Sequence, residues 1–346
     1  MRVHLQLDAP PDQAADRARW LAATGVDGLF TFEGQHDVFV PLTVAAMATD
    51  LPLMTNVAVA LPRSPLHLAH VAYDLHLLTQ GKFTLGLGSQ VRTHIERRYG
   101  AAWSRPAARM RESVAATREI LAAWQEQRPP AFRGEFTRHD FMPPMFAPPP
   151  LPWGAPPVML GALGPLMTQV AGEVADGLLV MPFNTRRHIL ERTLPALQAG
   201  LDRAGRRRED VTLVPQVIAA MGENDEEVAA SLVGASSLVA FYASTPAYRP
   251  VLEVAGHEEL QPRLQELVRT GDNDAMRAAL PDAVLDEVIV RGTPTECARQ
   301  IADKFAGISD QACVYFPGSR PTQDTIAHLV EALHTSTSSP PALGGS

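Results

Sequence analysis

The residues best suited to proton transfer follow a short apolar run near the amino terminus. The run 28–33 ends on Glu33, and His36 and Asp37 come within the next four positions. Histidine titrates near neutral pH, and a carboxylate close by is its usual partner in catalysis. We therefore interpret Glu33 and His36 as candidate catalytic residues. A loop histidine beside an aspartate is also commonly only a solvated pair, and the residues alone leave that alternative open.

A second candidate site is the segment Gly161-Ala162-Leu163-Gly164-Pro165, which follows the apolar run 157–160. Glycines allow a ligand to approach the backbone, and proline suits the first turn of a helix. The free N–H groups at a helix start bind anions such as a cofactor phosphate. An ordinary tight turn would need the same glycines. Gly86-x-Gly88 lacks the third glycine of the dinucleotide fingerprint, so it does not indicate a Rossmann site.

Two further groups of polar residues have both a chemical and a structural interpretation. His67, His70 and Asp74 share one face of an expected helix at a spacing that suits a metal, but packing residues on an outer helix are the simpler explanation. Other polar side chains interrupt apolar strands, where they either line a pocket or form hydrogen bonds within the core. These residues are Gln6, Asp8, Asn56 and Gln216.

The composition excludes several classes of protein. Of the 346 residues, 46% are hydrophobic and 20% charged, which predicts a large core and excludes disorder of the bulk. The net charge of −8, without a basic stripe, argues against nucleic acid or an anionic membrane as the main partner. Prolines interrupt the uncharged stretch 141–172, so no membrane-spanning helix is expected there. Two cysteines, Cys297 and Cys313, and no signal peptide predict a soluble, cytoplasmic protein.

Eight short apolar runs alternate with amphipathic helices along the chain, which predicts a parallel sheet with right-handed crossovers. The expected strands are 2–7, 28–33, 54–61, 82–87, 157–160, 177–181, 211–221 and 311–316. The expected helices are 11–24, 41–50, 65–79, 105–127, 166–175, 186–204, 294–305 and 322–334. Eight is the number that closes a TIM-type (β/α)8 barrel, whose active site lies at the carboxyl ends of the strands. A two-domain, doubly wound protein is the alternative.

Three stretches do not fit the repeat. We predict a hairpin insertion near 131–144, a helical excursion near 224–283 that covers one end of the barrel, and a disordered tail over 335–346. The remaining chain, residues 1–334, is then a single (β/α)8 barrel domain.

Several segments, in this order and spacing, resemble the luciferase-like monooxygenase superfamily, and in particular its actinobacterial branch dependent on coenzyme F420. The first covers residues 55–65 and continues through 78–88, the block from strand three to strand four. The second covers 157–165 and 171–177, the block from strand five to strand six, and the third is Arg291-Gly292-Thr293-Pro294. The similarity is collinear over roughly residues 1–334.

The resemblance implies a cofactor ring in the cleft at the strand ends, backed by a bulge with a non-prolyl cis peptide in strand three, expected around Val59-Ala60-Leu61. It implies that Gly161 to Gly164 hold the cofactor phosphate and that Gly88 and Ser89 approach the ring. The full set of cofactor-binding residues expected in this way is Val59, Ala60, Leu61, Gly88, Ser89, Gln90, Gly161, Ala162, Leu163, Gly164 and Met181.

The sequence also departs from the family pattern. Many relatives carry an acidic residue followed by histidine at the end of strand two, whereas Glu33 and Gly34 stand here, so His36 is only a nearby substitute. Ser89 replaces the glutamate of sugar-phosphate dehydrogenases, which argues against that activity. We expect hydride transfer between coenzyme F420 and a small or medium organic substrate, for example reduction of an activated C=C or C=N bond, by a homodimer. The alternatives are an FMN-dependent monooxygenase and a non-catalytic, cofactor-binding subunit.

Overall fold

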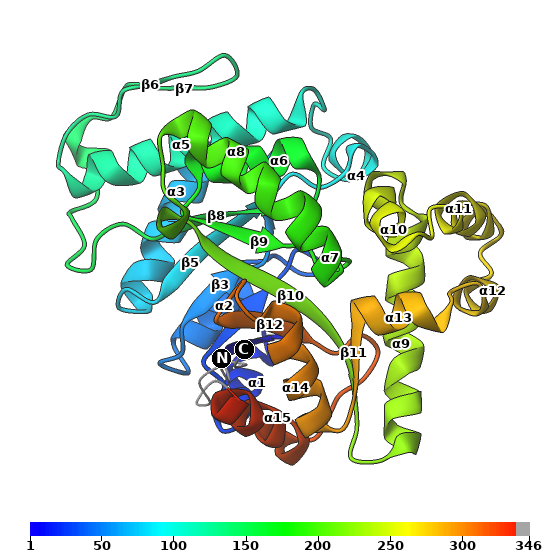
Figure 1. Cartoon of the computed structure of the whole chain (residues 1–346). Coiled ribbons are helices and arrows are strands. Elements are labelled where there is room, and N and C mark those ends of the chain that lie inside the picture. Colours follow the sequence, from blue (N-terminus) through cyan, green and yellow to red (C-terminus); the bar gives the residue numbers. More distant parts are fainter. Residues whose placement is uncertain (337–346) are drawn as a thin grey trace, which may run out of the picture.

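The computed structural model describes residues 1–336, and its central feature is a closed barrel of parallel strands (Figure 1). The barrel strands are β1 (Arg2–Gln6), β2 (Gly28–Thr31), β3 (Leu53–Thr55), β4 (Ala58–Val59), β5 (Phe83–Gly88), β8 (Val158–Ala162), β9 (Gly177–Val180), β10 (Thr212–Met221) and β12 (Gln311–Tyr315). Because β3 and β4 share one position, the barrel has the eight positions predicted. It closes where β10 pairs with β9 and β12, and β12 with β1.

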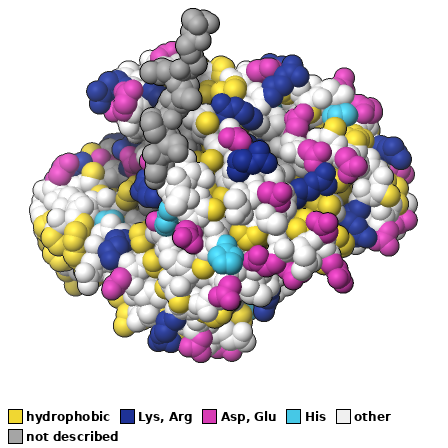
Figure 2. All heavy atoms as spheres, turned by 60° about the horizontal axis from the view of Figure 1, so that its bottom comes forward, with side chains coloured by type: hydrophobic (Ala, Val, Ile, Leu, Met, Phe, Trp, Pro, Cys, Tyr) yellow, Lys and Arg dark blue, Asp and Glu magenta, His cyan; other side chains and the backbone are white. Residues whose placement is uncertain are grey.

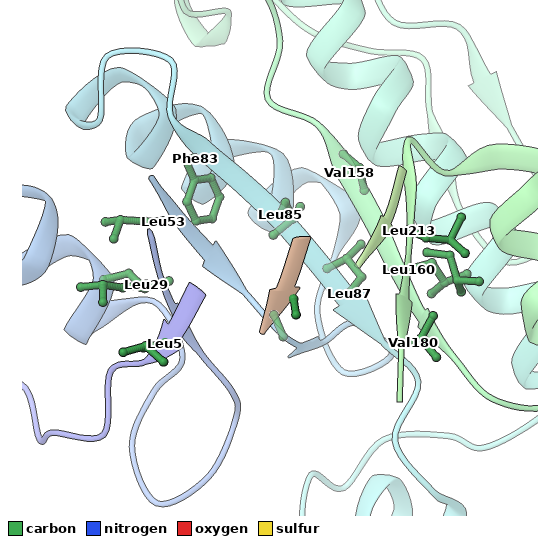
Figure 3. Packing of buried hydrophobic residues seen from close by; sticks show 14 of the residues in the cluster. Leu5, Leu29, Leu53, Phe83, Leu85, Leu87, Val158, Leu160, Val180 and Leu213 are labelled. Carbon is green, nitrogen blue, oxygen red and sulfur yellow. The ribbon is translucent and has the colours of Figure 1, made fainter. Parts of the chain in front are cut away.

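Alternate residues along the strands separate two apolar regions. Leu5, Leu29, Leu53, Leu85 and Leu160 point outward and are buried against the surrounding helices (Figure 3). The intervening residues point into the barrel, which we call the lumen, and form a second buried cluster. Its strand residues include Phe30, Met54, Met159, Leu179, Val214, Ile218, Cys313 and Tyr315.

The helices that cover the outside follow the predicted order with small changes in their ends. They are α1 (Ala14–Ala22), α2 (Val40–Ala46), α3 (Pro65–Leu78), α5 (Pro106–Gln125), α6 (Pro165–Val174), α8 (Leu194–Ala204), α14 (Pro294–Phe305) and α15 (Gln323–Ser336). The predicted helix 186–204 is divided into α7 (Arg186–His188), the π-helical turn η2 (Ile189–Thr193) and α8. The short helix α4 (Arg92–Arg97), after β5, was not predicted.

The third barrel strand differs from the prediction. The sequence predicts an unbroken strand over 54–61 with a cis peptide around residues 59–61, but the strand is interrupted at residues 56–57, and the cis bond joins Asn56 to Val57. The expected position was therefore wrong by about three residues. Ala58 and Val59 pair with β5, and Ala60 N–H still donates to Gly88 C=O, so this part of the chain has already rejoined the sheet.

The two insertions contain a hairpin and a helical lobe. The hairpin is β6 (Phe132–Arg133) and β7 (Arg138–His139), followed by the 3-10 turn η1 (Pro144–Phe146). The lobe, beside the barrel in Figure 1, contains α9 (Asp225–Ser244), the turn η4 (Pro246–Tyr248), α10 (Arg249–Ala255), α11 (Leu260–Thr270), α12 (Asn273–Ala278) and α13 (Asp282–Val288). It leads into β11 (Ile289–Gly292), an unpredicted strand that pairs with the end of β10.

Helix α9 is long and apolar enough to cross a membrane by length and composition alone. Its first turn carries Asp225, Glu226 and Glu227, and one face, which includes Ala235 and Val239, is buried against the barrel cluster. That pattern is typical of a core helix. On the face shown in Figure 2, acidic and basic side chains are interspersed. Of the predicted tail 335–346, Thr335 and Ser336 belong to α15, which corrects the prediction for these two, and the others lie outside the described residues.

Candidate active site

The carboxyl ends of the strands form the mouth of the barrel, and the lumen beneath it is almost entirely apolar. Three amide side chains are the exceptions near the mouth: Gln6 on β1, Asn56 after β3 and Gln216 on β10. Gln216 Nε2 donates to Asn56 Oδ1 at 2.6 Å. The sequence left open whether these residues line a pocket or bond within the core. The structure shows a core hydrogen bond between two of them.

The break in strand three is held by one hydroxyl group. Thr55 Oγ1 donates to Gly86 C=O at 2.7 Å and accepts from Gly86 N–H at 2.9 Å. Both partners are buried. The threonine side chain therefore takes the place of the backbone partner that Gly86 loses where β3 leaves β5, and both peptide groups of Gly86 stay paired.

The residue after the break, Val57, occupies space that two glycines leave open. A Cβ atom on Gly88 would lie 2.5 Å from Val57 Cγ2, and one on Gly161 would lie 3.0 Å from Val57 Cγ1. Glycine at these two positions therefore lets the Val57 side chain sit across the ends of β5 and β8. We expect Gly161 beside the cofactor phosphate, and its missing side chain also makes room for Val57. Val57, Leu163 and Met181 all pack against the lumen cluster.

Not all of the expected cofactor-binding residues face the mouth. Ala60, Leu61 and Ala162 pack with the outer cluster, between the barrel and its helices, and Val59 is buried in β4. Ser89 and Gln90 lie half-buried after β5, where Gln90 Oε1 accepts from Val91 N–H at 3.1 Å.

The start of α6 is open, as the sequence predicts for an anion site. Gly164 is its N-cap residue and provides no side-chain cap, and a Cβ atom added there would meet no atom within 4 Å. Leu166, the second helical residue, is 67% exposed. The first N–H groups of α6 therefore have room for a negatively charged group.

Glu33 is a clamp that fixes strand three. Its carboxylate accepts from Val59 N–H at 2.7 Å, from both Arg63 Nη atoms at 2.6 and 2.9 Å, and from Tyr99 Oη at 2.9 Å. The Glu33 side chain is only 8% exposed. Four donors fill the usual acceptor positions of a carboxylate, so Glu33 has none left for a substrate proton. Burial, together with this hydrogen bond, raises the pKa of Tyr99.

Asp37 joins Glu33 through Arg63, whose guanidinium pairs with both carboxylates, but His36 stands apart from this group. Asp37 accepts from Phe39 and Val40 N–H at 2.8 and 3.1 Å and so holds the start of α2. His36 is exposed, and within residues 1–336 it makes no hydrogen bond or ion pair. The two expected catalytic residues are thus separated: Glu33 is buried and fully hydrogen-bonded, and His36 lies in a solvated loop.

A group of aromatic residues between the lumen and the helical lobe was not found from the sequence. Tyr315, at the end of β12, shares a hydrogen bond with Tyr242 of α9, and the rings of Phe183 and Tyr248 lie 6.2 and 5.9 Å from that of Tyr242. Burial raises the pKa of Tyr315 well above its usual range and that of Tyr248 to about 12. These tyrosines therefore remain protonated, as hydrogen-bond donors.

A cavity of about 590 Å³ opens at the rim of the mouth, beside the ends of β1, β2 and β12. Its lining combines apolar groups with Gln6 and with Asp8, whose carboxylate pairs with Arg17 at 2.8 Å. Two other hollows, of about 630 and 670 Å³, lie away from the strand ends. One is next to Pro157 and Asp176 at the amino end of the barrel, and the other is between α7 and α14.

Of His67, His70 and Asp74, His70 has the packing role that the sequence favours over a metal site, whereas His67 is exposed. His70 of α3 lies with its ring 4.7 Å from that of Trp124, outside the barrel. Within the described residues, no group of three or more His, Cys, Asp or Glu side chains could hold a metal ion.

His4 of β1 is a buried histidine inside the barrel. It is 6% exposed, its Nδ1 has no hydrogen-bond partner among residues 1–336, and burial lowers its pKa to about 4. The unfolded chain takes up this proton near the ordinary value of 6.5. Between pH 6.5 and pH 4 the unfolded chain therefore binds more protons than the folded protein. The free energy of unfolding falls as the pH drops through this range, and it stops falling below the folded pKa.

We predict that His4→Gln makes this pH dependence shallower by roughly 1.4 kcal/mol per pH unit between about pH 4.5 and 6. Urea unfolding at several pH values measures the slope for the variant and the wild type. Parallel slopes would show that His4 is already protonated in the folded protein.

We predict that Thr55→Val lowers the free energy of unfolding by about 1–3 kcal/mol, because it leaves both peptide groups of Gly86 buried and unpaired. Thr55→Ser keeps the hydroxyl and is the matched control, with a smaller loss. Chemical denaturation of the three proteins tests this, and equal losses for Val and Ser would contradict it.

Comparison with known proteins agrees with this geometry. The family model of the luciferase-like monooxygenases matches residues 2–311. An uncharacterized protein of Mycobacterium tuberculosis is 42% identical over 317 residues, covering 90% of this chain and 93% of the relative. A putative coenzyme F420-dependent oxidoreductase of the same species is 26% identical over 326 residues, covering 87% of this chain and 91% of the relative.

Solved structures share the fold at low sequence identity. The coenzyme F420-dependent tetrahydromethanopterin reductase from Methanopyrus kandleri has a TM-score of 0.79 and 18% identity, covering 97% of this chain and 98% of that one. The oxygenating constituent of 3,6-diketocamphane monooxygenase from Pseudomonas putida, solved in complex with FMN, has a TM-score of 0.64 and 16% identity, covering 96% of each chain. The family expected from the sequence is confirmed: this chain belongs to the luciferase-like monooxygenases and has their TIM-barrel fold.

Proposed function

We propose that this protein is an oxidoreductase that binds the deazaflavin ring of coenzyme F420 in the barrel mouth, against Val57, and transfers a hydride between it and a small or medium organic substrate. The observation that carries the proposal is the position of Val57. Its side chain lies across Gly88 and Gly161, above an apolar lumen, at the carboxyl ends of the strands. A flat ring needs an apolar support of this kind that leaves one of its faces open.

The residues present fit such a cofactor. Val57, Leu163 and Met181 would contact the ring, and the unpaired amide nitrogen of Asn56 offers a donor at its edge. The open start of α6 at Gly164 would hold the anionic tail through its free N–H groups. When bound, the cofactor supplies or accepts the hydride, while the protein positions it and excludes water.

The groups around the mouth favour reduction of a polarised double bond. The lumen residues near the mouth are apolar or amide side chains, and the carboxylate of Glu33 is fully occupied. Tyr315, held by Tyr242, remains protonated and lines the cavity at the rim. A neutral hydrogen-bond donor of this kind orients and polarises an acceptor without a charged base. This supports a reductase of an activated C=C or C=N bond rather than an alcohol dehydrogenase.

The relatives support F420 without deciding between the two cofactors. The M. tuberculosis oxidoreductase and the M. kandleri reductase carry F420 in their names, whereas the P. putida monooxygenase is in complex with FMN. An FMN-dependent monooxygenase is therefore the second candidate.

Titration of the purified apoprotein with F420 and with FMN, followed by quenching of cofactor fluorescence, tests the proposal. We expect saturable binding of F420 that is at least about tenfold tighter than that of FMN, a difference of about 1.4 kcal/mol. Tighter binding of FMN would favour the monooxygenase, and binding of neither would remove the mouth as a cofactor site.

The role of Val57 can be tested by changing the space that its side chain occupies. Gly88→Ala places a methyl group in its space, so we predict a fall in cofactor affinity of about tenfold or more. Val57→Ala removes the conflicting atoms, and the double variant should recover part of the loss. The same fluorescence titration measures all three variants. If the loss of binding free energy in the double variant equals the sum of the losses in the two single variants, Gly88 acts independently of Val57.

A further inference from the structure

The Asn56 side chain is only half satisfied. Its residue is 3% exposed and its Oδ1 accepts from Gln216, but its Nδ2 has no hydrogen-bond partner of good geometry among the described residues. The only partner in reach among these residues is the Cys313 sulfur, which forms a side-chain hydrogen bond with this amide but is a weak acceptor. Buried polar groups are rarely left unpaired, because each one destabilises the fold, so an unpaired donor of this kind calls for a partner.

The Gln216 side chain determines which way this amide points. It donates its N–H to Asn56 Oδ1, so the oxygen of Asn56 is directed toward β10 and its NH2 group is left to the remaining space. The backbone of Asn56 is fixed as well, since its N–H donates to Thr31 C=O at 2.6 Å. The donor is thus held in place before any ligand binds.

The position of this donor coincides with the proposed ring site. Asn56 directly precedes Val57, and both side chains face the lumen, where one contacts Gln216 and the other the lumen cluster. Met54, Met159 and Leu179 of the lumen cluster carry no oxygen acceptor in their side chains. A ligand that rests on Val57 therefore brings its inner edge to the unpaired amide nitrogen of Asn56.

We propose that Asn56 Nδ2 donates a hydrogen bond to a carbonyl oxygen on the dione edge of the cofactor ring, and that Gln216 is the positioning residue that holds it there. This inference rests on the proposed function. F420 and FMN share the dione edge, so the contact serves either ring. The reduced ring carries additional negative charge on that edge, and a hydrogen bond to a charged acceptor is stronger than one to a neutral acceptor. Asn56 therefore favours the reduced form of the cofactor.

The direct test is Asn56→Asp, which keeps the shape of the side chain and replaces the donor by an acceptor. We expect the Kd of F420 and of FMN, measured by fluorescence quenching, to rise by roughly ten- to a hundredfold, and more for the reduced than for the oxidised cofactor. Asn273→Asp, the same change at an exposed position in α12, is the matched control and leaves the Kd unchanged.

Gln216→Glu tests the positioning role. A carboxylate at position 216 would attract the Asn56 NH2 group and turn its oxygen toward the ring, so we expect a comparable loss of affinity. A residue that serves only the packing of the barrel would instead show a change in stability without this loss.

The double variant Asn56→Leu with Gln216→Leu separates binding from folding. Replacing both partners by apolar groups removes the unpaired donor, so the apoprotein should keep or raise its melting temperature while losing cofactor affinity. Wild-type affinity in Asn56→Asp, or in the folded double variant, would overturn the inference and leave the proposed function intact. If the wild-type protein binds neither F420 nor FMN, both this inference and the proposed function are overturned.

Discussion

The candidate site depends on the hydroxyl group of Thr55. It bonds to both peptide groups of Gly86 at the point where β3 separates from β5, so the chain can leave the sheet inside a buried barrel. Four residues later the chain is fixed again, because the carboxylate of Glu33 holds Val59 N–H and the side chain of Arg63. Between these two fixed points, Asn56 and Val57 are free to turn into the lumen. The chemistry of the mouth is therefore set by how strand three is interrupted.

Most of the fold could be predicted because it follows from repeated local patterns. Eight apolar runs alternate with helices, and the leucines at 5, 29, 53 and 85 point outward as alternation requires. The position of the break could not be predicted, because Val57-Ala58-Val59-Ala60 continues the strand pattern without interruption. β11 was missed for the opposite reason, since its four residues follow a helix directly and show no alternation.

For the candidate site, the sequence indicated which residues lie at strand ends better than it indicated what their side chains do. Reasoning from strand ends led to Gly88, Gly161, Leu163 and Met181, which lie at the mouth. Glu33 was correctly placed at a strand end, but its function as a clamp depends on Val59, Arg63 and Tyr99, which local sequence does not bring together. The bond between Asn56 and Gln216 joins residues 160 positions apart, and Tyr315 meets Tyr242 only because α9 folds across the barrel.

The pairing of β10 with β11 has a consequence for how this protein can change over evolution. The helical lobe leaves the barrel after Met221 and returns at Ile289, the first residue of β11, which pairs with Ile218 in the same ladder. Beyond the ladder, Gly222 N–H donates to Gly292 C=O at 3.3 Å. The lobe is thus inserted between two points of attachment on one short parallel ladder. Lengthening, shortening or exchanging it would alter what approaches the mouth while leaving the strands that shape the mouth in register.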